Sequence, residues 1–115
     1  MAKIIEVLNT MISKKEKITN VIKKELEYFF IYNSKYKWSI VRDNNENYFV
    51  HFYPDASVSI EQLSEVYDWN QYNFVTYSTD DFKTNEAIET FRELYQIVSD
   101  KVYGLDDMFD EIINS

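Results

Sequence analysis

The aromatic residues most constrain the fold of this chain, because they make up 17% of it and occur along its whole length. Ten tyrosines, eight phenylalanines and two tryptophans supply a large apolar volume for 115 residues. Aromatic rings bury much apolar surface per residue, so even a short chain that is rich in them can build a hydrophobic core. Disordered chains lack such residues. We therefore expect one folded domain over residues 1–115.

Two segments in the middle of the chain predict an antiparallel hairpin. Residues 36–41 alternate bulky and mostly polar side chains, as a half-buried strand does. Residues 48–53 have the composition of a second strand, and the polar residues 43–47 supply the turn. Pro54 ends the second strand, because proline has no N–H to donate to the ladder. A third strand is predicted over residues 72–77.

The N-terminal segment predicts a helix over residues 2–31. Apolar residues recur there at spacings of three, four or seven, at Ile4, Leu8, Met11, Ile18, Ile22 and Phe29. Ser13 and Glu16 form a capping-box pattern within this segment. Two alternatives follow: one long helix, which we favour, or two helices with a break near Ser13.

Three further helices are predicted after the hairpin. A short helix over residues 60–67 follows a second capping-box pattern, and a longer helix begins after Thr84 and ends at Gly104. A last helix begins at Asp106, with an inner face of Met108, Phe109, Ile112 and Ile113. The order α-β-β-α-β-α-α indicates an α+β fold. In it, a small antiparallel sheet of three to four strands packs against an N-terminal long helix and the C-terminal helices.

The composition excludes several kinds of chemistry. Without cysteine the chain has no disulfide, thiolate nucleophile or cysteine-based metal site, and Gly104 alone cannot build a phosphate-binding loop. His51 is the only histidine, and we expect it at the edge of the core or facing water rather than acting as a general base. We therefore expect the protein to have no enzymatic activity and to bind no cofactor or metal ion. An enzyme with a carboxylate-lined pocket is the remaining catalytic alternative.

The charge is strongly polarised along the sequence. Residues 1–37 hold eight lysines and four glutamates, a net charge of +4, whereas residues 38–115 carry −12. The lysines of the first segment are interleaved with glutamates and do not form one stripe, so we do not expect direct nucleic-acid binding. No apolar run reaches the length of a membrane span, and Glu6 interrupts the early apolar run. We therefore expect a cytoplasmic protein with no membrane association.

The acidic residues of the last two helices are the candidate partner-binding residues. Glu86, Glu89, Glu93 and Asp100 recur at helical spacings, and the last helix adds Asp106, Asp107, Asp110 and Glu111. Two such helices side by side would present a negative surface that steers a basic partner into contact. Such a surface can also serve solubility alone. The same acids in the last helix lack the pattern and the glycine of a calcium-binding loop.

Tyr67 and Trp69 add two aromatic candidates in a polar loop, where such rings anchor interfaces. The alternative is that Trp69 packs on the sheet as part of the core. We interpret the chain as a non-enzymatic binding module for a basic protein, such as a toxin or nuclease, in the manner of a bacterial or phage immunity protein or inhibitor. The alternatives are a small acidic chaperone and a homo-oligomer, with a homodimer as its simplest form, in which the basic first helix of one copy contacts the acidic helices of another.

Overall fold

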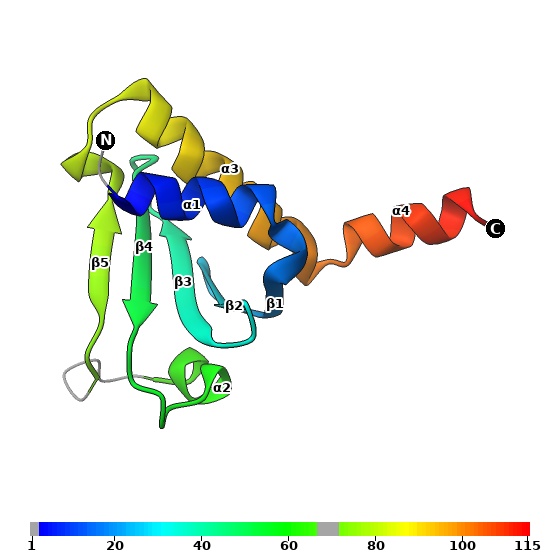
Figure 1. Ribbon diagram of the computed structural model, residues 1–115, viewed down its shortest axis with the longest axis horizontal. Helices are drawn as coiled ribbons and strands as arrows, with labels where there is room; N and C mark the ends of the chain where they lie inside the picture. Colours follow the sequence, from blue (N-terminus) through cyan, green and yellow to red (C-terminus); the bar gives the residue numbers. More distant parts are fainter. Residues whose placement is uncertain (1–2, 67–71) are drawn as a thin grey trace.

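The computed structural model describes residues 3–66 and 72–115, with the backbone alone at residues 105 and 106. The chain folds as an N-terminal helix, a five-stranded antiparallel sheet and C-terminal helices, which confirms the α+β class (Figure 1). The helical elements are α1 (Lys3–Ser13), η1 (Lys15–Lys17), α2 (Ile60–Ser64), η3 (Thr79–Asp81), α3 (Asn85–Val102) and α4 (Leu105–Ile113). The strands are β1 (Ile18–Lys24), β2 (Glu27–Tyr32), β3 (Tyr36–Arg42), β4 (Tyr48–Tyr53) and β5 (Val75–Ser78).

The sheet is a meander in which each strand pairs with the next, in the order β1-β2-β3-β4-β5. The predicted hairpin is confirmed as β3 and β4, with Ile40 opposite Val50, and β4 ends immediately before Pro54. The predicted strand over residues 72–77 is displaced to β5, Val75–Ser78. The expected count of three to four strands was too low, because β1 and β2 lie in the segment assigned to a helix.

The prediction of a helix over residues 2–31 was wrong beyond Ser13, where α1 ends. The alternative break near Ser13 was correctly placed, but a hairpin and not a second helix follows it. Residues 28–32 are all aromatic or β-branched, and such residues favour a strand. A two-residue turn joins β1 to β2, with Glu25 at φ 57°. Asn20, at φ 55°, lies where the β1–β2 register shifts.

The main core lies between one face of the sheet and the helices α1 and α3, which both cross that face (Figure 1). Leu8 of α1, Phe91 of α3, and Phe30 and Ile40 of the sheet are fully buried in it. Close packing of side chains from four elements fixes how the helices sit on the strands. The Thr90 hydroxyl of α3 also donates to the side chain of Asn9 in α1, at 3.2 Å.

A smaller core covers part of the opposite face of the sheet. It joins Phe29 and Tyr53 to Ile60 and Leu63 of α2. The predicted capping box at the start of α2 is confirmed, with Ser59 accepting a hydrogen bond from the Gln62 N–H at 3.1 Å. The buried Lys37 ammonium donates to the backbone carbonyls of residues 55 and 58, which ties the loop before α2 to β3.

The two C-terminal helices differ in what their apolar faces contact. α3 begins as predicted, with Thr84 accepting from the Ala87 N–H at 3.2 Å. After α3, Gly104 takes φ 62° and the chain turns into α4, which projects away from the body (Figure 1). The predicted inner face of α4 was wrong, because its side chains face solvent: Met108, Phe109, Ile112 and Ile113 are 42–77% exposed.

Two phenylalanine-to-alanine substitutions test this difference between α3 and α4. Phe91→Ala should lower the free energy of unfolding by about 3–5 kcal/mol, because the ring is fully buried and its removal leaves a cavity. Phe109→Ala should change it by no more than about 0.5 kcal/mol at low protein concentration, because that ring is 50% exposed. Urea unfolding of both variants measures this. Equal losses would show that α4 packs on its own chain.

Candidate functional site

The strongest charged feature is a row of carboxylates along the outer side of α3, here called the acidic face of α3: Glu86, Glu89, Glu93 and Asp100. The three glutamates are exposed and Asp100 is half-buried, whereas Phe91, Leu94 and Val98 of the same helix are buried in the core. At 1.5 Å per residue the row extends over about 21 Å. The predicted solvent-facing position of the three glutamates is therefore confirmed.

Little of this charge is neutralised by the described part of the chain. Glu89 pairs with Arg92 one turn along the same helix, and Asp100 accepts a hydrogen bond from Gln96 at 2.8 Å. Glu86 and Glu93 make no ion pair with any residue that the structure describes. Exposed ion pairs such as Arg92–Glu89 contribute little to stability, and Glu86 in the first turn of α3 complements the helix dipole.

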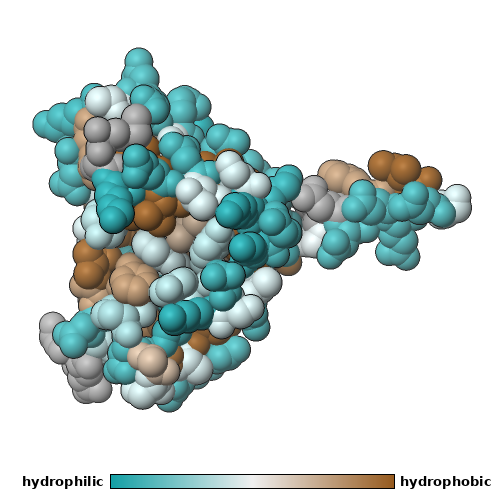
Figure 2. Space-filling view, viewed as in Figure 1, coloured by the Kyte–Doolittle hydropathy of each residue, from teal (hydrophilic) through white to brown (hydrophobic). Residues whose placement is uncertain are grey.

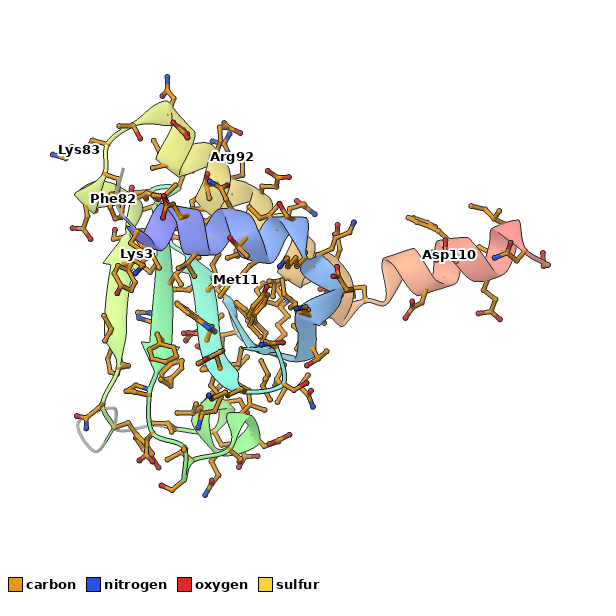
Figure 3. The ribbon with its side chains drawn as sticks, viewed as in Figure 1. Lys3, Met11, Phe82, Lys83, Arg92 and Asp110 are labelled. Carbon is orange, nitrogen blue, oxygen red and sulfur yellow. The ribbon has the colours of Figure 1, made fainter. Side chains whose placement is uncertain are left out.

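The acids of α4 lie on a different part of the molecule. Asp107, Asp110 and Glu111 are exposed, and only the backbone of Asp106 is described. Because α4 projects beyond the end of α3, Asp110 lies well away from Arg92 and its neighbours on α3 (Figure 3). Asp107 lines a hollow together with Asp100 of α3, so only the outer acids of α4, such as Asp110, are separated from the acidic face of α3. Tyr67 and Trp69 fall outside the described residues.

A polar cluster on the sheet face that α2 partly covers was not anticipated from the sequence. The Ser39 hydroxyl donates to the Glu27 carboxylate at 2.5 Å and lies 2.8 Å from the Tyr53 hydroxyl, which is 3.5 Å from the same carboxylate. The His51 Nδ1 lies 2.8 Å from the Thr76 hydroxyl. The edge of the Phe74 ring packs against the His51 imidazole, with centroids 5.5 Å apart.

Burial governs the protonation of this cluster. Desolvation raises the pKa of Glu27, and the hydrogen bonds from Ser39 and Tyr53 act in the opposite direction. Desolvation lowers the pKa of His51, so its imidazole is neutral at pH 7. Burial and the nearby Glu27 carboxylate raise the pKa of Tyr53, which stays protonated.

The geometry of the cluster fits a structural network better than a catalytic pair. The His51 Nε2 is 4.0 Å from the nearest Glu27 oxygen, which is too long for a hydrogen bond. The Glu27 carboxylate is instead bonded to Ser39 and Tyr53, so these groups link β2, β3 and β4 across the sheet. The expected position of His51 at the edge of the core is confirmed, since its side chain is 18% exposed.

This cluster was missed because its members meet only through strand register. Ser39 lies opposite Phe29 and His51, and Thr76 lies opposite His51, which places these side chains in one row across the sheet. Glu27 had been assigned to a helix, and that assignment removed it from the sheet. A correct β2 assignment, from the aromatic run at residues 28–32, was the signal needed to place it.

Neither a metal site nor a membrane-spanning helix is found among the described residues. No three of the histidine and acidic side chains placed by the structure come together in a way that would hold a metal ion. In residues 3–66 and 72–115, none of the helices has both the length and the apolar character needed to cross a bilayer.

No protein-family model matches the chain, and neither does any characterised protein or solved structure with which it was compared.

Glu27→Gln tests the polar cluster through the pH dependence of stability. A carboxyl whose pKa is raised on folding stabilises the folded state while it is protonated, and this contribution is lost as the pH rises through the folded pKa. The variant should therefore gain stability relative to the parent protein between pH 4.5 and pH 7, measured by urea unfolding. A difference that is constant or reversed over this range would contradict the assignment.

Proposed function

We propose that this protein is a non-enzymatic binding module whose acidic face of α3 engages a basic protein. The observation that carries the proposal is the row of exposed carboxylates at Glu86, Glu89 and Glu93, on a helix whose opposite side is fixed in the core. The packed helix holds the backbone of these residues in place, so only their side chains need to be ordered on binding. That preorganisation lowers the entropic cost of association.

The overall charge supports the same proposal. The chain carries a net charge of −8, and two of the three glutamates have no neutralising partner among the described residues. Such a field attracts a positively charged partner over a Debye length and raises its association rate. A basic toxin or nuclease is the kind of partner that fits, and the role is that of an immunity or inhibitor protein.

The polar cluster around Glu27 supports a non-enzymatic assignment. Its carboxylate and hydroxyls are bonded to one another, and its histidine is neutral and beyond hydrogen-bond distance of the carboxylate. A histidine general base is usually oriented by a carboxylate within hydrogen-bond distance, and Glu27 does not reach His51 in this way. We therefore assign the cluster to sheet stability.

The triple substitution Glu86→Gln, Glu89→Gln and Glu93→Gln tests the proposal. The variant should fold as the parent does, because all three side chains are exposed. Immobilised parent protein, incubated at low salt with a lysate of the cells that produce it, should retain a basic protein that the variant does not retain. With that protein in hand, its association rate with the variant should be about tenfold lower at low ionic strength.

A matched control separates the acidic face of α3 from net charge. Glu25→Gln, Glu46→Gln and Glu61→Gln change the charge by the same amount at exposed positions outside α3. This control should retain the basic protein as the parent does. Equal loss in the two triple variants would leave only a nonspecific charge effect and would refute the proposed site.

A further inference from the structure

The apolar face of α4 carries large apolar side chains that are exposed to solvent. It consists of Met108, Phe109, Ile112 and Ile113, and Ile113 is 77% exposed. Figure 2 shows apolar residues on one side of the projecting helix and hydrophilic residues on the other. Soluble proteins rarely expose a contiguous apolar stripe unless it forms an interface. We therefore expect another apolar surface to cover this face of α4.

An open apolar groove lies on the same molecule, below α1. Its volume is about 510 Å³, and its walls come from α1 and from the ends of β2, β3 and β4. Apolar side chains gather on the sheet in this region (Figure 2). We refer to this cavity as the α1 groove, and its lining residues are Lys3, Glu6, Val7, Thr10, Met11, Tyr32, Tyr36, Trp38 and Phe52.

Trp38, one of the lining residues, carries a buried donor that is not satisfied by the described residues. The buried Nε1–H of Trp38 has no hydrogen-bond acceptor among them. A buried N–H without an acceptor is uncommon, because its desolvation is costly.

The dimensions of the helix and the groove agree. α4 has nine residues and is about 13 Å long at 1.5 Å per residue. The α1 wall of the groove runs from Lys3 to Met11, which is also nine residues and has the same length by this measure. The apolar side chains of α4, from Met108 to Ile113, cover about 8 Å of that length.

The charges at the two surfaces are complementary. Lys3 lies at the α1 groove, and Lys35 is 5.2 Å from the centre of the Tyr36 ring that lines it. α4 exposes Asp107, Asp110 and Glu111 beside its apolar face. Within the lining Glu6 balances Lys3, so the positive charge available to these acids comes from Lys35 beside Tyr36.

The connection between α3 and α4 favours an occupant from another molecule. Only Tyr103 and Gly104 lie between Val102, the end of α3, and Leu105, the start of α4. Two residues span at most about 7 Å. α4 leaves the body in the direction away from the sheet, so this short connection does not return it to the α1 groove of its own chain (Figure 1).

We propose that two copies of this chain form a homodimer in which α4 of each copy lies in the α1 groove of the other. In this reciprocal arrangement a two-fold axis relates the two contacts, so no surface is left to propagate a fibre. The acidic side of α4 stays at the rim, next to the lysines. This pairing uses neither Glu86, Glu89 nor Glu93, so it stands or falls independently of the basic partner proposed above.

Engineered disulfides test the contact, because the natural chain has no cysteine. Thr10→Cys places a thiol in the groove wall of one full-length chain. Met108→Cys or Ile113→Cys places a thiol at either end of the α4 face in a second chain, so one of them meets Thr10 in either orientation. Mixing the two chains in a redox buffer should give a covalent heterodimer at least about tenfold faster than control pairs, measured by intact mass.

The control pairs use exposed positions that do not enter the α1 groove, one of them at the rim of the contact. Asp110→Cys lies on the acidic side of α4, and Ser57→Cys lies in the loop before α2. Rates equal to those of the control pairs would overturn the proposal. A Thr10→Cys/Ile113→Cys or Thr10→Cys/Met108→Cys chain that closes into a disulfide-linked monomer would also overturn it, by showing that α4 occupies its own groove.

Sedimentation equilibrium of unmodified cysteine-free chains provides the second test. The parent protein should dimerise, and Ile112→Asp should raise the dissociation constant at least about tenfold, because an apolar side chain at the centre of the face becomes charged. Ile112 is 63% exposed, so this variant should fold. The control Asp110→Ala should change the constant by less than about threefold. A parent protein that stays monomeric at millimolar concentration would refute the dimer.

Discussion

Burial of one face of the sheet beneath α1 and α3 is the constraint on which the rest of the structure depends. Phe30 and Ile40 of the sheet, Leu8 of α1 and Phe91 of α3 are all excluded from water in this layer. Because Phe91 and its neighbours fix the rotation of α3, the glutamates on the other side of that helix must face solvent. Because α3 ends at Val102, the packing of α3 also fixes the point from which α4 leaves the body.

α3 and α4 show that the same amphipathic pattern has two structural outcomes. Both helices carry acids on one side and apolar residues on the other, but only α3 finds the sheet within reach of its apolar side. Hydrophobic burial stabilises α3 within the chain, and its glutamates are left exposed on the opposite side, where we propose that a basic partner binds. The apolar side of α4 is not buried within the described chain, and in the proposed homodimer the α1 groove of a second copy covers it.

The sequence predicted those elements whose local signals agree with their tertiary contacts. Alternation and Pro54 define the β3–β4 hairpin, and Thr84 with an apolar stripe defines α3. Residues 18–32 were misassigned because Ile18, Ile22 and Phe29 satisfy the helical spacing while they also fit two paired strands, and pairing between strands is not a local property. The polar cluster depends on the register of β2, β3 and β4, so a pattern within one segment does not reveal it. The exposure of α4 followed from the absence of a surface within reach, which amphipathicity alone does not report.

Hydrogen exchange of the backbone amides at several protein concentrations tests most directly whether the intrachain core ends with α3. The account predicts that amides of α1, α3 and the central strands are protected equally at every concentration, because their contacts are within one chain. Protection of the α4 amides should increase with concentration, as a second copy covers the helix. Amides of α4 that are protected as strongly as those of α3 at the lowest concentration would contradict the account, because α4 would then pack on its own chain.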